Sequence, residues 1–579
     1  MKRVLFSGVL FCGLAWTVAA QEGGAVLDEE KDAAFDRIAE EVTVFTDRDF
    51  VFSSVPEPMK GKTFLFGMID GDREIRIRKG GRLEVITPVK GVCSNVKELE
   101  GYGFKRVEEI KPYQLFGSNP FDVSAVYAKQ VRDGDAYRFK KWVVFAGFSE
   151  EGLPKYQPPK VSERMARIIE SWKGTAFEKH CRNVLVNRPD YLVFVPKQKL
   201  ENRTPTNLRA PGDTYNDHFQ VIEHNGKLFA FWTQATYEGA RDQHIAFSKS
   251  LDKGETWSEP VILAGSHCWG IPGLLASWQQ PMISKSGRIY CLWNQQTTSR
   301  GPHCGEMIGF YSDDDGETWS PPKQVTWGQR MDADPADPLV PPSWCNWQRP
   351  LRLGEGGKYL VGVSRHGKAP YDPRPNCKVE FLQYDNIDEN PEVQDIRLKF
   401  FSTNRDALAV FNPKMGDACE EAAIVKLPDG RLFALMRSSI GHPVWSQSRD
   451  NGVTWTRPKP LLNKDGGTAY LHPRSPCPMY DWKGCEAGSG KYFALVHQTF
   501  DFNGKSEYQH RGPLYLIAGT FNPDAEQPVE FAEPKLFAPR KGGNSFYTSY
   551  TYFDGKGILW FNDQKYFLLG REIGPEWWE

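Results

Sequence analysis

Residues 250–257 read Ser-Leu-Asp-Lys-Gly-Glu-Thr-Trp, and the pattern Ser-x-Asp-x-Gly-x-Thr-Trp occurs again at residues 312–319 and 448–455. The final tryptophans are 62 and then 136 residues apart, and because 136 is twice 68, one unit of similar length lacks the motif. In such a segment the Asp side chain can accept hydrogen bonds from turn N–H groups, the Gly permits a positive φ, and the Trp anchors the turn. The three copies therefore predict a β-turn that returns at the same place in a repeated unit.

A second repeat runs in phase with these turns over residues 190–579. Each unit is a strand, a turn that contains glycine, and a strand that ends in aromatic residues, as in residues 219–232 and 281–293. The turn glycines are separated by 60 to 74 residues; they are Gly226, Gly287, Gly356, Gly430, Gly490 and Gly555. Six near-regular β units of this length are typical of a propeller with blades of about four strands. The sequence thus predicts an all-β fold with a six-bladed β-propeller over residues 190–579.

The N-terminal end carries the features of an export signal. Lys2 and Arg3 precede an apolar stretch, and Ala19 and Ala20 end it. A positively charged start, a short apolar run and small residues at its end are typical of a secretory signal peptide. Residues 1–20 are therefore expected to be a signal peptide, and the protein is expected to be exported to the periplasm, the cell surface or the medium.

Three further segments are expected before the propeller. Residues 28–41 are charged and are expected to form either a short exposed helix or a leader to the first domain. Residues 42–150 alternate apolar and polar residues between glycine turns, which predicts a small β-rich domain whose role the sequence does not indicate. Residues 151–189 begin with a proline-rich break, and residues 161–183 carry apolar residues at helical spacing. A linker and a connecting helix are expected there.

The composition excludes several classes of protein. The 579 residues contain 72 Lys and Arg against 73 Asp and Glu, a net charge of -1, so the basic excess of a nucleic-acid-binding protein is absent. No apolar stretch reaches the roughly 20 residues of a membrane span. The cysteines are scattered singly; export permits disulfides, but no CxxC or HExxH spacing indicates a metal. We expect no nucleic-acid partner, no membrane span, no metal and no cofactor, and the oligomeric state is not indicated.

The three repeated turns resemble the Asp-boxes, also called BNR repeats, of sialidase-type six-bladed propellers. The resemblance covers roughly residues 190–579 and implies the propeller fold. The Asp-box itself is a structural device on the outer rim of the propeller, and propellers that are not sialidases also carry it. Any chemistry must therefore be read from other residues.

A hairpin over residues 420–437 carries the first candidate catalytic and substrate-binding residues. It turns at residues 428–431, so Glu421 and Arg437 are expected near the same end, away from the turn. A carboxylate and a guanidinium placed in this way can face a shared pocket, or they can form a structural salt bridge. The segment resembles the sialidase stretch in which a Glu begins one strand and an active-site Arg ends the next. The resemblance implies that Glu421 is the base partner of a nucleophilic Tyr, and that Arg437 binds a substrate carboxylate.

Further roles follow from the same resemblance. Arg511 opens a strand in the next unit, at a position similar to the third arginine of the family, although a solvated loop residue is the alternative. Tyr547 begins a stretch similar to the one that holds the family's nucleophile, although it can also be an ordinary strand aromatic. Glu421 can take the phenol proton, and nearby arginines stabilise a phenolate. The resemblance implies that Asp242 is the general acid, and Asp217 is the alternative.

The sequence departs from the family at the first blade. Sialidases have Phe-Arg-Ile-Pro there, and this chain has Tyr-Asn-Asp-His-Phe at residues 215–219, so the first arginine of the triad is absent. Arg349, two units later, is expected to place a guanidinium at the central pore instead. Asp217 and His218 are expected to face the substrate, and an imidazole with a near-neutral pKa can act as acid or base in hydrolysis or in β-elimination.

Three hypotheses of function result. The first is a secreted glycoside hydrolase of the sialidase type that releases terminal anionic sugars, with sialic acid as a candidate, from glycans. The second is a propeller enzyme that acts on another polysaccharide, as another glycosidase or as a lyase. The third is a non-catalytic glycan-binding propeller whose aromatic side chains stack on sugars. In each case the expected partner is a glycan.

Overall fold

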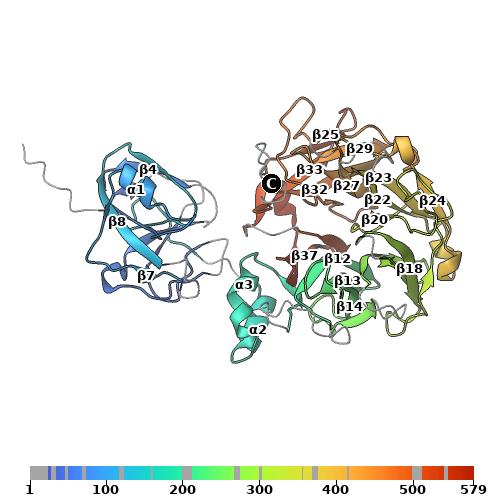
Figure 1. The fold of residues 1–579 in the computed structure, drawn as a ribbon, viewed down its shortest axis with the longest axis horizontal. Coiled ribbons are helices and arrows are strands. Elements are labelled where there is room, and N and C mark those ends of the chain that lie inside the picture. The colour runs from blue at the N-terminus through green and yellow to red at the C-terminus, as the bar shows by residue number, and fades with distance from the viewer. Residues whose placement is uncertain are drawn as a thin grey trace, which may run out of the picture. The chain divides into compact units, whose positions relative to one another are not determined.

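The chain forms two compact units, Met1–Pro158 and Pro159–Glu579 (Figure 1). The computed structural model describes residues 24–27, 34–45, 50–67, 73–116, 123–157, 161–197, 211–265, 274–298, 301, 303–354, 356–367, 376–413, 416–498, 511–539 and 546–579. The predicted signal peptide, residues 1–20, lies outside the described residues. No helix among the described residues is long and apolar enough to cross a bilayer.

The first unit is built from two antiparallel sheets. One sheet has the order β1-β4-β9, and the other has the order β2-β3-β10-β5-β8-β6 with β7 paired to β8. The strands are β1 (Val26–Leu27), β2 (Ala34–Arg37), β3 (Thr63–Phe66), β4 (Arg73–Lys79), β5 (Gly81–Pro88), β6 (Lys105–Arg106), β7 (Tyr113–Gln114), β8 (Val123–Val131), β9 (Ala136–Phe139) and β10 (Val144–Ala146). The described residues of this unit also form a 3-10 turn at Glu57–Met59 and the helix α1 (Val96–Gly101). The unit is β-rich, as expected, but it begins before residue 42.

The helix expected within residues 28–41 is not found in the part that the structure describes. Residues 34–37 instead form β2, which pairs antiparallel with β3. Phe35 is buried and packs in the core of the first unit, while Asp36 and Arg37 are not buried. Pairing with β3, which runs over all four residues, therefore decides this segment rather than its charges.

The connecting segment is helical, as expected from its apolar spacing. It contains α2 (Glu163–Trp172), a short 3-10 turn at Glu178–His180, and α3 (Cys181–Leu185). The Ser162 side chain accepts a hydrogen bond from the Met165 N–H (3.3 Å) and caps α2. Met165 and Trp172 are buried in a cluster with residues of the last two sheets of this unit, so the helix is docked by its apolar face.

Among its described residues, the second unit has six sheets of four or five strands, and Figure 1 shows them following one another around a ring. The first three are β12 (Tyr215–His224), β13 (Lys227–Ala235), β14 (His244–Ser250) and β15 (Val261–Ala264); β16 (Ala276–Ile283), β17 (Ile289–Gln296), β18 (Gly305–Ser312) and β19 (Lys323–Gln324); and β20 (Trp344–Cys345), β21 (Leu351–Arg352), β22 (Tyr359–Gly367), β23 (Asn376–Tyr384) and β24 (Leu398–Phe401). The all-β prediction is confirmed.

The second half of the ring continues this pattern. Its sheets are β27 (Cys419–Lys426), β28 (Leu432–Ser438), β29 (Val444–Ser448) and β30 (Lys459–Pro460); β31 (Met479–Asp481), β32 (Lys491–Val496), β33 (Leu514–Phe521), β34 (Val529–Phe531) and β35 (Lys535–Ala538); and β36 (Ser549–Phe553), β37 (Lys556–Asp563), β38 (Phe567–Glu572) and β11 (Tyr191–Phe194). The last sheet is completed by β11, which comes before the first sheet in the sequence and pairs with β38. This pairing ties the two ends of the ring together.

The Asp-box turns share one set of hydrogen bonds. In the first, the Gly254 N–H donates to Ser250 Oγ (2.8 Å) and the Thr256 N–H donates to Asp252 Oδ1 (2.9 Å). The turns at residues 312–319 and 448–455 repeat both bonds at 2.8 to 2.9 Å. The predicted role of the Asp and Gly residues in the turn is therefore confirmed.

The glycine of each Asp-box also lies against the preceding sheet. A Cβ atom added at Gly316 would lie 2.6 Å from the Phe247 ring, and one at Gly452 would lie 2.4 Å from the Leu360 side chain. At Gly254 the neighbours are Tyr191 at 3.1 Å and Trp560 at 3.3 Å. The turns therefore serve as close contacts between successive sheets as well as turns.

Candidate functional site

Three inner strands carry the same irregularity near their first residues. The pairing register shifts in β12, β16 and β27. Within each bulge one non-glycine residue has a left-handed backbone: φ is 52° at His218, 58° at Trp278 and 56° at Glu421. A bulge redirects a side chain, and a left-handed φ costs a non-glycine residue on the order of 1 kcal/mol or more. Repeated strain at equivalent points of three sheets marks this end of the ring as the candidate site.

Tyr547 and Glu421 meet at this end although 126 positions separate them in the chain. The Tyr547 hydroxyl donates to Glu421 Oε1 (3.3 Å), and both side chains are buried. The Tyr547 ring is enclosed by the ring of His218, with centroids 4.7 Å apart, and by that of Trp347, at 5.2 Å. The structure therefore brings the predicted phenol and carboxylate into direct contact, with aromatic walls around the phenol.

Glu421 and its neighbour Glu420 lie within a cluster of guanidinium groups. Arg437 Nη1 donates to both carboxylate oxygens of Glu421 (3.0 Å each), and Arg437 Nε lies 3.3 Å from Glu420 Oε2. Glu420 also pairs with Arg474, whose backbone carbonyl accepts a bond from Arg511 Nη2 (2.7 Å). Three guanidiniums against two carboxylates leave this cluster with one net positive charge, which favours an anionic ligand.

Burial and these charges set the protonation states. Burial, and next the Glu421 carboxylate, raise the pKa of the Tyr547 phenol well above its usual value, while Arg437 opposes them. Burial disfavours the charged form of Glu420, but Arg437 and Arg474 prevail and lower its pKa to about 2. At neutral pH Tyr547 is therefore a neutral phenol that needs a base to become a nucleophile, and Glu421 is the carboxylate in contact with it.

His218 is held as a neutral ring by its neighbours. The Trp278 Nε1–H donates to His218 Nε2 (3.1 Å), and because an indole nitrogen only donates, the ring proton must be on Nδ1, which lies 3.3 Å from Thr233 Oγ1. Burial lowers the pKa of His218, although Asp217 opposes this. Both ring nitrogens are thus occupied, and His218 serves as an aromatic wall of the site in this arrangement.

Asp217 is ionised and paired. Its Oδ2 accepts from the Tyr215 hydroxyl (2.8 Å) and its Oδ1 from Asn562 Nδ2 (2.7 Å), and Lys565 Nζ also lies 2.8 Å from Oδ2. Burial opposes the charge, but the Lys565 ammonium holds the pKa of Asp217 below its usual value. Lys565 also lies over the Tyr547 ring, 5.2 Å from the centroid. A lysine thus supplies a cation beside Tyr547.

Two predicted residues lie away from Tyr547 and Glu421. The Asp242 carboxylate accepts from the Gly212 N–H (2.8 Å) and from the N–H and hydroxyl of Thr236, so it binds loop backbone, and its predicted role as general acid gains no support from its contacts. Arg349 lies 3.7 Å from Glu486 and lines a cavity of about 300 Å³ to which neither Tyr547 nor Glu421 contributes. Its role in substrate binding stays a prediction.

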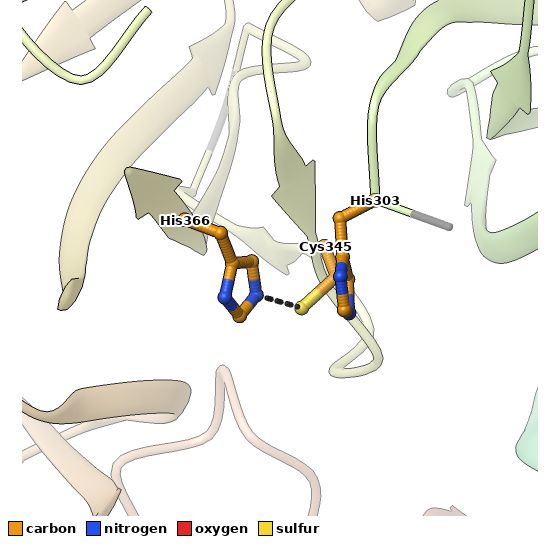
Figure 2. A group of neighbouring side chains, drawn as sticks. All are labelled: His303, Cys345 and His366. Atoms are coloured by element: carbon orange, nitrogen blue, oxygen red, sulfur yellow. Dashed lines mark hydrogen bonds between the residues drawn. The ribbon is translucent and has the colours of Figure 1, made fainter. Parts of the chain in front are cut away.

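Sequence reasoning missed Arg474, Lys565 and a group of sulfur and nitrogen side chains next to Tyr547. Figure 2 shows that group: His303, Cys345 and His366, with ligand atoms all within 4.8 Å of one another. No spacing rule finds these residues, because they lie in turns and strand ends whose lengths differ between units. The structure brings two of them together by pairing β20 with β22, which sets Cys345 opposite Ser364, two residues before His366.

Residues 226–475 match the family model described as a BNR repeat-like domain. This part of the chain is similar to BNR repeat-like domains. The matched range includes all three Asp-box turns together with Glu421, Arg437 and Arg474, and Tyr547 lies beyond it. The resemblance to BNR repeats is confirmed, and the matched range supplies the carboxylates and two of the three guanidiniums of the site. A search of curated proteins finds no match to the chain.

Solved structures with similar folds include three that differ in source. NanB sialidase from Streptococcus pneumoniae has 10% identity and a TM-score of 0.47, over 92% of this chain and 86% of that chain. The intramolecular trans-sialidase from Ruminococcus gnavus has 12% identity and a TM-score of 0.40, over 63% and 95%. A protein of unknown function from Dyadobacter fermentans has 15% identity and a TM-score of 0.43, over 66% and 97%. Similarities of this size do not identify a substrate.

Proposed function

We propose that this protein is an exported glycoside hydrolase of the sialidase type that releases terminal anionic sugars from glycans. The observation that carries the proposal is the contact chain from Tyr547 to Glu421 to Arg437, which joins a phenol, a base and a cation from two different sheets. Export rests on the signal-like sequence of residues 1–20. The net positive charge of the surrounding cluster supports an anionic substrate.

The proposed reaction has two steps. In the first, Glu421 takes the phenol proton while the Tyr547 oxygen attacks the anomeric carbon, and the glycosidic bond breaks with its electron pair on the departing oxygen, which takes a proton from solvent. In the second, water attacks the anomeric carbon and gives one proton to solvent, the bond from that carbon to the Tyr547 oxygen breaks, and Glu421 returns its proton to the phenolate. A neutral nucleophile avoids the repulsion that a carboxylate would meet from an anionic sugar, and sialidases are the known exception to the two-carboxylate rule.

The choice of sugar is a separate question. The position of the missing arginine is held by Asp217, Lys565 and His218, which favours a second candidate substrate, a terminal acidic sugar other than sialic acid. The lyase alternative gains no support, because both nitrogens of His218 are already hydrogen bonded. An unsaturated product that absorbs in the ultraviolet would identify a lyase, and free sugar without that absorbance identifies a hydrolase.

The test uses aryl α-sialosides and aryl uronides, because an aryl leaving group departs without protonation and so needs no general acid. We expect release of the aryl alcohol within about pH 4 to 8, and loss of at least about 10³-fold in kcat for Tyr547→Phe. Tyr550→Phe is the matched control: Tyr550 is a buried tyrosine of the same segment whose hydroxyl donates to the Trp482 carbonyl (2.7 Å).

Two results would contradict the proposal. Absence of release from every aryl glycoside would remove the hydrolase activity, and glycan binding that Tyr547→Phe leaves unchanged would then favour the non-catalytic binding module. Release that Tyr547→Phe does not reduce would retain a hydrolase but remove Tyr547 as its nucleophile.

A further inference from the structure

A thiol and two imidazoles converge beside the candidate active site. Cys345 Sγ lies 3.3 Å from His366 Nε2, and the ligand atoms of His303, Cys345 and His366 all lie within 4.8 Å of one another (Figure 2). The rings of His303 and His366 are stacked, with centroids 4.1 Å apart. Trp278 stacks on the other face of His303 at 4.9 Å. This stack fixes the orientation of both imidazoles next to the sulfur.

The backbone that carries these residues is regular. Cys345 ends β20, which pairs with β22, and His366 lies near the end of β22. The His303 carbonyl accepts a hydrogen bond from the Trp344 N–H (2.9 Å), so the turn that holds His303 is joined to β20. Ligands that come from paired strands are positioned more exactly than ligands from free loops. The three side chains are therefore held together by the sheet itself.

Thiolate and imidazole are the ligands that zinc prefers. Metal–ligand bonds of about 2.0–2.3 Å in a tetrahedral site place the ligand atoms roughly 3.3–3.8 Å apart. The contact between Cys345 and His366 already has this length, and every separation in the group is within 4.8 Å, about 1 Å more than such a site needs. A hydrogen bond would explain the Cys345–His366 pair and ring stacking would explain the placement of His303, so metal binding has to be shown by titration.

We propose that His303, Cys345 and His366 bind one zinc ion. Bound there, the ion would fix β20 and the His303 turn against β22. Cys345 is buried in one cluster with Trp278, Trp347 and Tyr547, so the ion would stabilise the aromatic wall beside Tyr547. His303, Cys345 and His366 are thus positioning residues for this aromatic wall. The binding of zinc does not depend on the proposed glycosidase activity.

The experiment titrates the full-length protein, freed of metal by a chelator and kept reduced. Cobalt(II) serves as a spectroscopic probe because it occupies zinc sites, and a thiolate ligand gives a charge-transfer band in the near ultraviolet with intense visible bands for tetrahedral geometry. We expect one equivalent of cobalt to produce these bands, and one equivalent of zinc to abolish them. Calorimetric titration with zinc measures the affinity directly.

Cys345→Ala is expected to abolish the charge-transfer band and to weaken zinc binding at least about 100-fold. Cys377→Ala is the matched control: its sulfur also faces His366, at 4.0 Å, but lies outside the group of three. The control is expected to keep one equivalent of zinc and the band. Circular dichroism of each variant shows whether it is folded.

Three results would overturn the assignment: no charge-transfer band in the wild-type protein, binding that Cys345→Ala leaves unchanged, or a loss in Cys377→Ala as large as in Cys345→Ala. If Cys345→Ala does not fold, His303→Gln replaces it, and retention of full zinc affinity there would overturn the assignment equally. None of these measurements uses a glycan, so failure of the zinc site and failure of the proposed hydrolase remain distinguishable.

Discussion

At the scale of single residues, the candidate site concentrates backbone strain and buried charge. Glu421 has φ of 56°, and its N–H donates to Ser364 Oγ (2.8 Å), so a hydrogen bond from the neighbouring sheet helps to hold the strained conformation. The strain directs the carboxylate towards Tyr547 and Arg437. The residue that the proposed chemistry needs is thus one that the local backbone disfavours.

The strain can be measured by comparing Glu421→Gly with Glu421→Ala. Both variants remove the carboxylate, but only glycine adopts a left-handed φ without steric cost. We expect the glycine variant to be more stable than the alanine variant by about 1 kcal/mol, as measured by urea unfolding. An alanine variant of equal or greater stability would mean that the bulge is not strained.

The pKa of Glu420 makes the ion cluster sensitive to acid. Arg437 and Arg474 lower that pKa from 4.5 to about 2 against the effect of burial. A carboxyl whose pKa is lower in the folded state stabilises the fold above its unfolded pKa, and the stabilisation is lost as pH falls towards the folded pKa. The ionised Glu420 carboxylate therefore stabilises the fold near neutral pH, and this stabilisation is lost in strong acid.

Between about pH 5 and pH 3, Glu420→Gln is expected to lose less of its free energy of unfolding than the wild-type protein does. The difference between the two losses is expected to be at most about 3 kcal/mol. The free energy of unfolding in urea at several pH values gives these losses, which are informative even if the variant is less stable throughout. If the free energy of unfolding falls equally with pH in both proteins, the pKa of Glu420 is not lowered by folding.

At the scale of elements, the Asp-box is a docking device as well as a turn. Its glycine must be left-handed, with φ of 78° at Gly316, and it must also leave room for Phe247 of the preceding sheet. Gly430, at the turn between β27 and β28, has a similar φ of 85° but has no neighbour within 4 Å of an added Cβ. A comparison of substitutions at Gly316 and Gly430 therefore separates the cost of a left-handed backbone from the cost of a steric contact with the neighbouring sheet.

Gly316→Ala is expected to destabilise the protein by about 1–3 kcal/mol more than Gly430→Ala. Both substitutions force alanine into a left-handed conformation, so the difference isolates the contact with Phe247. Urea unfolding of the two variants provides the measurement. Equal destabilisation would mean that the Asp-box glycine acts through its turn alone.

The elements also show where sequence reasoning succeeds and fails. The repeated turns and hairpins were predictable because each sheet repeats the same packing problem, and Glu421, Arg437 and Tyr547 could be placed because they lie on or just before such strands, at positions that resemble a known family. The strand at residues 34–37 was not predicted within residues 28–41, because four residues with one buried side chain carry no periodic signal. Arg474 and Lys565 were missed because segments that join strands follow no period.

At the scale of the whole molecule, the two compact units have cores of their own. Phe64 is fully buried in the core of the first unit, and Tyr191 is buried in β11, where its ring packs against Trp560 and its hydroxyl donates to Glu572 (2.8 Å). Tyr191 thus belongs to the strand that closes the ring. The architecture predicts two cooperative transitions on heating, one for each unit.

Phe64→Ala is expected to lower the transition temperature of the first unit, and Tyr191→Ala that of the second. Each substitution removes a large buried side chain and costs about 3–5 kcal/mol of stability. Differential scanning calorimetry resolves the two. A single transition that both substitutions lower together would show that the units unfold as one.

The pairing of β11 with β38 has a consequence for how the gene can be rearranged. Because the strand that precedes the ring and the strand that ends it are hydrogen-bonded neighbours in one sheet, no sheet is topologically the first. A circular permutant of the ring that joins residue 579 to the start of β11 through a designed linker, and that opens the chain at the exposed turn beside Gly430, would carry every sheet of the ring and every site residue in an altered order.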